Sequence, residues 1–272
     1  MASQRERAEE FHRLHHGEVL VLPNAWDAAS ARLVEQAGAV AVATTSGGLA
    51  WSLGFPDGDR VPREAAVAAV ARIAAAVTVP VSADIESGFG ETLEALAATV
   101  GAVLDAGAVG VNVEDFAGDG LRPAAAQAER IAMVRRTADA AGVPLFVNAR
   151  VDVFLRRVGD PADRLAETVR RAAAYAEAGA DGIFVPGVLD PPVLRELVAA
   201  VSKPLNVLAG PGAAPVAELA ALGVRRVSVG TWPAEAAYGT ARRVAVELLT
   251  AGTYEAMTGS GVDYAELNTL LG

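Results

Sequence analysis

Short apolar runs alternate with amphipathic segments along most of the chain, and two boundary signals mark where each apolar run begins. One signal is a glycine that follows Ala or Leu, which suits the left-handed residue just past the end of a helix. The other is a proline, which stops a helix from continuing. Seven such boundaries follow one another along the sequence: Gly38, Pro80, Gly107, Pro144, Gly179, Pro204 and Gly223.

The apolar runs after these boundaries are rich in Val, Ala and Ile and do not alternate with polar residues. This pattern is typical of strands that are buried on both faces of a parallel sheet. With an opening strand in VLVLPNAWD, the pattern predicts eight strands. The segments between them, such as REAAVAAVARIAAAV and DRLAETVRRAAAYAEA, have the periodicity of amphipathic helices.

Eight strand–helix units in this length predict a (βα)₈ TIM barrel, with a doubly wound sheet as the alternative. No linker divides the chain, so we expect one domain over residues 1–272. The barrel should cover about residues 18–232, and additional C-terminal helices about residues 233–272. These last helices are long enough to pack outside the barrel or to reach a partner subunit.

Composition narrows the chemistry that the chain can perform. The 272 residues include no cysteine and three histidines, all within the first sixteen positions, and Lys203 is the only lysine. Thiolate metal sites, disulfides and cysteine nucleophiles are therefore excluded. The net charge of −10 makes nucleic acid an unfavourable partner. With neither a secretory signal nor an apolar run of membrane-spanning length, we expect a cytoplasmic protein.

Polar residues gather where the predicted strands end. In a barrel, the carboxyl ends of the strands and the loops that follow them carry the catalytic groups. The amino ends, by contrast, carry Gly, Pro and Ala. The polar strand ends are residues 24–27, 44–48, 84–88, 112–115 and 148–152, together with Asn206.

Four of these residues are carboxylates on two adjacent predicted strands, namely Asp84, Glu86, Glu114 and Asp115. Like charges this close raise one another's pKa, and a divalent cation would relieve the repulsion. A site built from oxygen ligands alone favours Mg²⁺ or Mn²⁺. The alternative is that some of these carboxylates cap helices or pair with Arg150.

Other candidates have two interpretations each. Ser46-Gly47-Gly48 could bind a carboxylate or phosphate through backbone N–H groups, or form an ordinary turn. Arg150 could bind a substrate carboxylate as a fork, or form a structural ion pair. Lys203 precedes the seventh strand, away from the predicted site, which argues against a Schiff base. The three histidines, His12, His15 and His16, are expected on a solvated helix face.

The stretches PNAWDAASARL, TTSGG, GFPDGD, PVSADIESGFG, GVNVED and VNARVD together resemble the isocitrate lyase/phosphoenolpyruvate mutase superfamily, and most closely its phosphonomutase-like branch. The likeness extends from about Val21 to Tyr238. It implies a Mg²⁺-dependent (βα)₈ enzyme that acts on 2-oxo acids or their adducts through an enolate, with cleavage of a C–C or C–P bond.

The resemblance also implies a role for each matching residue. Asp84 would bind the metal directly, and Glu86 and Glu114 would bind it mainly through water. The residues expected to act in catalysis are Asp57 on a mobile loop, Glu114 and Arg150. The residues expected to bind substrate are Trp26, Ser46, Gly47, Gly48, Asp84, Arg150 and Asn206.

Two departures from the family pattern limit this expectation. Lyases of the superfamily carry a K-[KR]-C-G-H loop after the fourth strand, where this chain has FAGDGLRPAAAQ. The sixth-strand Glu or His of relatives is replaced by Gly187. The general acid/base of the lyases is therefore missing or relocated.

Three functions remain open. The first is a lyase or decarboxylase for a small 2-oxo or 2-hydroxy carboxylic acid, without the catalytic cysteine. The second is a phosphonopyruvate hydrolase or mutase. The third is a 2-oxo acid binding protein without catalysis. The resemblance further suggests a homotetramer built as a dimer of dimers, with the helix AEAAYGTARRVAVELL exchanged between subunits.

Overall fold

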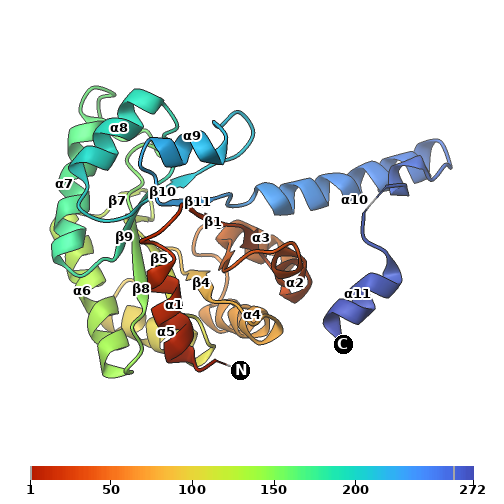
Figure 1. The fold of residues 1–272 in the computed structure, drawn as a ribbon, viewed down its shortest axis with the longest axis horizontal. Coiled ribbons are helices and arrows are strands. Elements are labelled where there is room, and N and C mark those ends of the chain that lie inside the picture. Colours follow the sequence, from red (N-terminus) through yellow and green to blue (C-terminus); the bar gives the residue numbers. More distant parts are fainter. Residues whose placement is uncertain (1, 260) are drawn as a thin grey trace.

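The computed structural model describes residues 2–259 and 261–272, and its main feature is a parallel sheet that curves into a barrel (Figure 1). Neighbouring strands in this sheet pair in parallel throughout. Around the sheet the strands run β1 (Leu20–Leu22), β11 (Arg226–Ser228), β10 (Leu205–Leu208), β9 (Gly182–Val185), β8 (Phe146–Arg150), β5 (Gly110–Glu114), β4 (Val81–Asp84), β3 (Val42–Thr44) and β2 (Asn24–Ala25).

The sheet closes because β1 and β2 are two halves of one stretch of chain, separated by Pro23. Proline has no N–H to donate, and the ladder changes partners at this residue. Leu20 pairs with Arg226 on β11, whereas Asn24 pairs with Ala43 on β3. The first and last strands of the sheet are thus continuous in sequence, which confirms eight barrel strands and rules out the open, doubly wound alternative.

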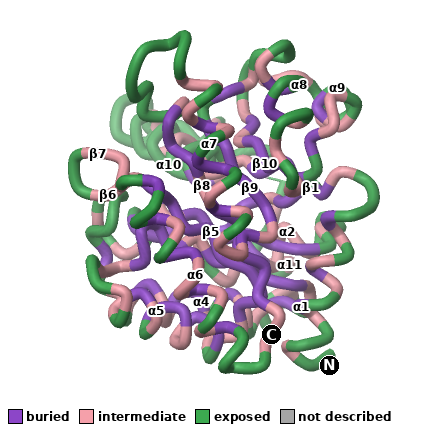
Figure 2. The backbone as a smooth tube through the Cα atoms, turned by 90° about the vertical axis from the view of Figure 1, so that its left-hand side faces the viewer, coloured by how far each residue is buried: buried purple, intermediate pink, exposed green. Residues whose placement is uncertain are grey.

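Helices surround the barrel (Figure 2). Buried apolar residues of these helices and of the strands belong to one core cluster. The strands and the inner helix faces are buried, while the outer faces and the loops are exposed. This arrangement is what the apolar runs and amphipathic segments predict. The surrounding helices are α2 (Ala28–Gln36), α4 (Arg63–Ala76), α5 (Leu93–Asp105), α6 (Ala124–Ala140), α7 (Arg164–Glu177), α8 (Pro191–Ala200) and α9 (Val216–Ala221).

Two short elements lie at the carboxyl ends of the strands. Helix α3 (Ser46–Ser52) begins directly after β3. Strands β6 (Phe116–Ala117) and β7 (Gly120–Leu121) form a small antiparallel hairpin after β5. Both elements belong to the end of the barrel where the sequence predicts the functional site.

Helix α1 (Gln4–Arg13) closes the opposite end of the barrel. Phe11 on this helix is fully buried, and a Cβ at Gly110 would come within 2.7 Å of its Cε1, so glycine leaves the room for the ring. His15 follows the helix and stacks on Phe146, with ring centroids 3.8 Å apart.

The expectation that all three histidines are solvated is therefore wrong for His15, of which only 2% is exposed. Its Nδ1 is hydrogen-bonded to the Phe11 carbonyl at 2.7 Å. His12 is half-buried and its Nε2 contacts the Pro144 carbonyl at 3.1 Å. The sequence pattern missed this because α1 packs across the barrel floor rather than along its outside.

The predicted C-terminal helices are present outside the barrel. Helix α10 (Trp232–Thr250) leads away from β11, a short 3₁₀ turn η1 (Glu255–Met257) follows, and α11 (Tyr264–Leu271) returns to pack on α2 (Figure 1). Arg32 on α2 donates from Nε to the Leu270 carbonyl at 3.0 Å. Within the described residues, no helix combines the length and apolar character that crossing a bilayer requires.

Candidate functional site

Three predicted site residues end adjacent strands and lie together. Asp84 ends β4, Glu114 ends β5 and Arg150 ends β8. Glu114 and Arg150 are partners in the strand register, and the Arg150 Nη1 atom lies 2.6 Å from Glu114 Oε2. The geometry therefore brings the metal-binding and carboxylate-binding candidates to one end of the barrel, as the sequence predicts.

Asp152 holds the other side of the Arg150 guanidinium, and sequence reasoning gave it no role. Arg150 donates from Nε to Asp152 Oδ1 at 2.7 Å and from Nη2 to Oδ2 at 3.0 Å. Asp152 itself is fully buried. The spacing in VNARVD is the signal that could have found it, because residues i and i+2 of an extended chain share a face.

These contacts leave Arg150 able to bind a ligand. A guanidinium has five N–H donors; two of those of Arg150 donate to Asp152, and its Nη1 forms an ion pair with Glu114. Nη1 and Nη2 therefore keep N–H groups with which a guanidinium can take a carboxylate in a fork. Both interpretations of Arg150, as a structural ion pair and as a carboxylate ligand, are therefore compatible with its position.

Burial and mutual repulsion raise the pKa values of the carboxylates in this cluster. Burial raises the pKa of Glu86 to about 8, and Asp84 adds to that shift. Burial also raises the pKa of Glu114 well above its usual range, with Arg150 acting against the shift. The pKa of Asp84 is raised for the same reasons. With its pKa at about 8, the Glu86 carboxyl group is mostly protonated near neutral pH unless a cation compensates its charge.

The charges of the inner barrel indicate which cation would fit. Besides burial, the negative charge of Asp84 raises the pKa of Glu86 and of Glu114, and Arg150 is the guanidinium in contact with Glu114. A divalent cation would offset the negative charge of these carboxylates, and oxygen ligands suit Mg²⁺ or Mn²⁺.

The arrangement of the donors limits how a metal could be held. Among the residues that the structure describes, no three carboxylate or histidine side chains already converge at ligand spacing. Direct binding by Asp84, with Glu86 and Glu114 reached through water, needs fewer than three direct protein ligands. The donor chemistry fits a hard divalent cation in that mode, and the three assignments stay predictions.

Close packing at the start of α3 explains its two glycines. A Cβ at Gly47 would lie 2.7 Å from Thr231 Cγ2 and 3.4 Å from the Asp57 carboxylate. A Cβ at Gly48 would lie 3.0 Å from the Cβ of Trp26. Trp26 after β2, Gly47 and Gly48 after β3, and Asp57 on the loop between α3 and α4 are thus neighbours.

The segment between α3 and α4, which carries Asp57, is tied to the site by Glu86. The Asp59 N–H donates to the Glu86 carboxylate, and Ser46 N–H lies 3.4 Å from Asp84 Oδ2. Glu86 adopts φ +51°, a left-handed conformation that is uncommon for residues other than glycine. Asp57 is exposed, so it can approach a ligand from the solvent side.

Asp115 lies apart from the metal-binding candidates. Its carboxylate accepts from Tyr175 Oη at 2.8 Å, from Arg171 Nη1 at 3.0 Å and from the Asp152 N–H at 2.9 Å. Burial raises the pKa of Asp115, which these donors oppose. Asp115 therefore forms an ion pair, as the alternative expected, but with Arg171 in place of Arg150. By accepting from the Asp152 N–H, Asp115 also helps to position Asp152, which binds the Arg150 guanidinium.

Asn206 lies in a layer of amides inside the barrel. Its Oδ1 accepts from Asn148 Nδ2 at 3.0 Å, and its Nδ2 lies 3.2 Å from Ser228 Oγ. Asn148 also donates to Asn112 Oδ1 at 2.8 Å. The amide of Asn206 already has protein partners, and its role in substrate binding stays a prediction.

Close packing explains why position 187 is glycine, which the sequence alone did not reveal. The residue adopts φ +84°, and a Cβ there would lie 2.6 Å from Leu155 Cα and 2.7 Å from Leu155 N. The loop after β8 therefore occupies the space that a side chain at this position would need. A glutamate or histidine cannot be accommodated at Gly187 without displacing that loop.

Comparison with known proteins gives consistent matches. The family model described as phosphoenolpyruvate phosphomutase matches residues 11–249. An uncharacterised protein from Mycobacterium tuberculosis is 40% identical over 264 residues, covering 96% of this chain and 95% of the relative. The 2-methylisocitrate lyase of Escherichia coli (strain K12) is 32% identical over 183 residues, covering 64% of this chain and 60% of the enzyme.

Solved structures share the fold. A candidate lyase/mutase from Burkholderia cenocepacia J2315 is 39% identical with a TM-score of 0.91, over 98% of this chain and 96% of that one. A phosphonopyruvate hydrolase in complex with oxalate and Mg²⁺ is 25% identical with a TM-score of 0.83, over 97% of this chain and 94% of that one.

Proposed function

Because the chain belongs to the phosphoenolpyruvate phosphomutase family, within the isocitrate lyase/phosphoenolpyruvate mutase superfamily, we propose that it is a Mg²⁺-dependent lyase or decarboxylase. Its substrate would be a small 2-oxo or 2-hydroxy carboxylic acid, and the bond cleaved would be C–C. Superfamily members include 2-methylisocitrate lyases and a phosphonopyruvate hydrolase. The observation that carries the proposal is the guanidinium of Arg150, which contacts Glu114 and lies beside Asp84 at the ends of adjacent strands.

In this proposal each side chain binds or orients one part of the substrate. The two free N–H groups of Arg150 bind the substrate carboxylate, and Asp152 keeps the guanidinium in place. Backbone N–H groups at Ser46, Gly47 and Gly48 approach the oxo group. Asp84, Glu86 and Glu114 would hold a divalent cation, which when bound stabilises negative charge that develops on a neighbouring oxygen.

Proton transfer falls to Asp57 in this proposal. The cysteine loop of the lyases is absent, and the backbone of Leu155 fills the space beside Gly187. Asp57 is a carboxylate on an exposed loop whose position next to Gly47 brings it to the bound oxo acid. Closure of that loop would exclude water and place the acid/base next to the substrate.

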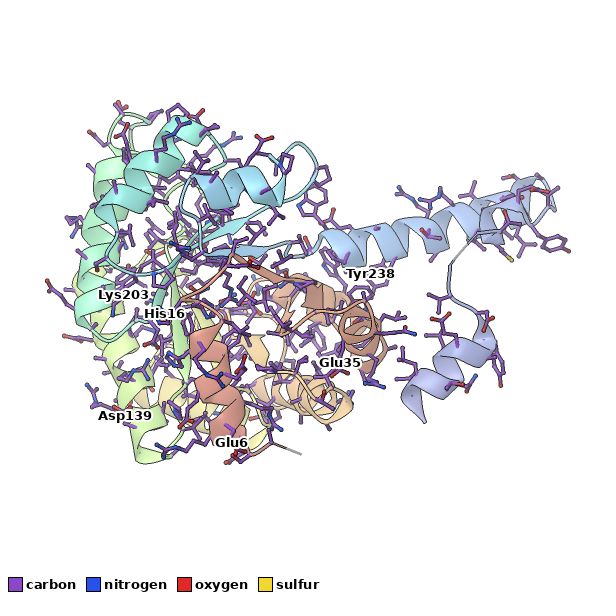
Figure 3. All side chains as sticks on the ribbon, in the orientation of Figure 1. Glu6, His16, Glu35, Asp139, Lys203 and Tyr238 are labelled. Atoms are coloured by element: carbon purple, nitrogen blue, oxygen red, sulfur yellow. The ribbon has the colours of Figure 1, made fainter. Side chains whose placement is uncertain are left out.

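Replacement of Asp84 tests the proposal. Addition of Mg²⁺ with oxalate should raise the thermal unfolding temperature of the unmodified protein, because a ligand that binds only the folded state stabilises it. Asp84→Ala should lose this rise and all turnover across a panel of C4–C7 2-oxo and 2-hydroxy acids. Asp139→Asn, an exposed carboxylate on α6 (Figure 3), is the matched control and should behave as the unmodified protein. Unchanged turnover in Asp84→Ala would refute the proposal.

A second candidate is C–P bond cleavage, as in a phosphonopyruvate hydrolase or mutase. The proximity of Asp57 to Gly47 favours it, because a carboxylate there could act at a phosphoryl group. A ³¹P measurement with phosphonopyruvate distinguishes the two reactions: inorganic phosphate or phosphoenolpyruvate would form only if the C–P bond is the one broken. Oxo-acid binding without any product would instead favour a protein that binds and does not catalyse, a function motivated by the glycine at position 187.

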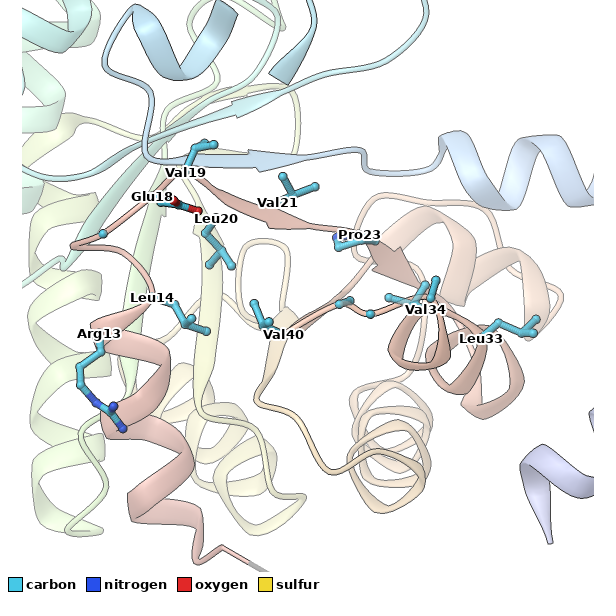
Figure 4. A pocket seen from close by; sticks show the side chains of 14 residues that line it. Arg13, Leu14, Glu18, Val19, Leu20, Val21, Pro23, Leu33, Val34 and Val40 are labelled. Carbon is cyan, nitrogen blue, oxygen red and sulfur yellow. The ribbon is translucent and has the colours of Figure 1, made fainter. Parts of the chain in front are cut away.

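We also propose that the chain forms a homo-oligomer, a dimer of dimers, through α10. An apolar groove of about 790 Å³ runs beside β1 (Figure 4), and Val21 and Val40 on its walls are 43% and 53% exposed. In a barrel the helix after the last strand ordinarily covers this region, whereas α10 projects away from it (Figure 1). The α10 helix of a second copy, with Leu249 84% exposed, suits the groove.

A further inference from the structure

A second arginine lies next to the Arg150 guanidinium, on the loop that follows β8. The Nε atom of Arg156 lies 3.9 Å from Asp152 Oδ2, and the same oxygen lies 3.0 Å from Arg150 Nη2. The two guanidiniums thus flank one buried carboxylate. Arg150 is on its inner side, and Arg156, with 42% of its side chain exposed, is on its solvent side.

Arg156 is oriented by an aromatic ring from the neighbouring loop. Its Cζ lies 4.1 Å from the centroid of Phe116, which belongs to the β6–β7 hairpin after β5. Stacking on a ring face holds a guanidinium without using its N–H groups. Because β5 and β8 are adjacent strands, this contact spans the two loops beside the Glu114–Arg150 ion pair.

The charge and the donors of Arg156 remain available. Asp152 is already bound by two hydrogen bonds from Arg150, and at 3.9 Å it is too far for a hydrogen bond to Arg156. Among the described residues, no group accepts a hydrogen bond from this guanidinium. Arg122, another arginine on this side of the barrel, differs because it is paired with Glu91 at 2.9 Å.

From this geometry we propose that Arg156 binds a second carboxylate of the substrate and makes the site selective for dicarboxylic over monocarboxylic acids. The inference rests on the proposed function, in which Arg150 binds the first carboxylate. The two arginines lie on either side of Asp152, and each keeps N–H groups that Asp152 does not accept. A ligand with two carboxylates a few bonds apart can reach both, whereas a monocarboxylate reaches Arg150 alone.

Lactate and malate form a matched pair for the test, because both are 2-hydroxy acids and they differ by one carboxylate. Binding is measured by calorimetry with Mg²⁺ present. Oxalate serves as a probe of the inner part of the site, because its two carboxylates are bonded directly to each other and both occupy the position beside Arg150 in the proposed function. We expect the unmodified protein to bind malate at least about tenfold more tightly than lactate, the scale of one hydrogen-bonded charge pair. Arg156→Gln should reduce this preference to less than about threefold and change oxalate binding by less than about twofold.

Control variants separate recognition from folding. Arg157→Gln removes the adjacent exposed charge and should leave the malate preference intact. Arg156→Lys keeps the charge without the planar fork and should give an intermediate preference. Phe116→Leu removes the stacking and should weaken malate more than oxalate. Circular dichroism melting of each variant shows whether it is folded. We expect the Arg156 variants to fold, because 42% of that side chain is exposed.

The outcomes distinguish this inference from the function on which it rests. If oxalate with Mg²⁺ does not bind the unmodified protein, the proposed function fails and this inference fails with it. If oxalate binds but the unmodified protein shows no malate preference, Arg156 does not read a second carboxylate. The inference is also overturned if oxalate binds and Arg156→Gln retains the full preference, while the proposed function stands.

Discussion

His15 is the residue whose surroundings differ most from what its sequence context suggests. Stacking on Phe146 and packing beneath the barrel remove it from water, and the positive charge of Arg226 nearby disfavours its protonation. Burial lowers the pKa of His15 to about 3, with Arg226 adding to the effect and the Phe11 carbonyl opposing it. The imidazole is therefore neutral in the folded protein across the physiological range.

This buried imidazole makes the protein sensitive to acid. Below about pH 6.5 the unfolded chain takes up a proton at His15 that the folded protein does not, so stability is lost as the pH falls from there toward about 3. Between pH 7 and 5 this one group should reduce the free energy of unfolding by about 2 kcal/mol. In His15→Gln, the fall in the free energy of unfolding between pH 7 and 5 should be smaller by about 2 kcal/mol. Urea denaturation at both pH values measures it. Equal losses in the two proteins would contradict the assignment.

At the scale of elements, the loop after β8 and the turn after β9 constrain each other. Gly187 has φ +84°, and the backbone of Leu155 occupies the position of its missing side chain. The same loop carries Arg156 and Asp152, and Asp152 lies between the guanidiniums of Arg150 and Arg156. A change at Gly187 should therefore affect both stability and the carboxylate-binding groups.

Gly187→Ala should destabilise the protein by about 3 kcal/mol, since it combines a left-handed alanine with overpacking against Leu155. Gly212→Ala is the matched control. Its φ is +89°, and no described heavy atom lies within 4 Å of the added Cβ, so only the backbone cost of about 1–2 kcal/mol applies. Chemical denaturation of both variants measures the difference. Equal losses would show that the Leu155 contact carries no weight.

The elements themselves were largely predictable from sequence, because glycine and proline boundaries and unbroken apolar runs report on local backbone and burial. The eight barrel strands and the C-terminal helices follow from them. The packing of α1 under the barrel does not, since it depends on the space that Gly110 leaves for Phe11. Strand ends likewise indicated Asp84, Glu114 and Arg150. The partnership of Asp115 with Arg171 and Tyr175 did not follow from sequence, because it depends on how α7 packs against the residue after β5.

At the scale of the whole molecule, the exposed large apolar side chains concentrate on the C-terminal helices, from α10 to α11. Leu249 is 84% exposed, Val246 is 55% exposed and Tyr264 is 85% exposed. The groove beside β1 adds Val21 and Val40 on the barrel itself. The apolar residues of the C-terminal helices of one copy can therefore pack into the groove beside β1 of a second copy.

Oligomer formation through these surfaces should depend on both of them. Leu249→Asp on α10 and Val40→Asp in the groove should each reduce the mass in solution, because each places a charge in the proposed contact. Light scattering after size-exclusion chromatography measures that mass. Val158→Asp, which alters an exposed apolar residue on the loop after β8, is the control and should leave it unchanged. A single-chain mass for the unmodified protein would refute the proposed assembly.

The first barrel strand, divided at Pro23, has a consequence for the order in which the chain can fold. Its second half finds its partner nearby, since Asn24 pairs with Ala43. Its first half must wait for the end of the barrel, since Leu20 pairs with Arg226. Contacts between residues so far apart in sequence form slowly, because a long loop must close before they are made. During synthesis β2 can join its sheet early, while β1 stays unpaired until β11 has emerged and the barrel shuts along that seam.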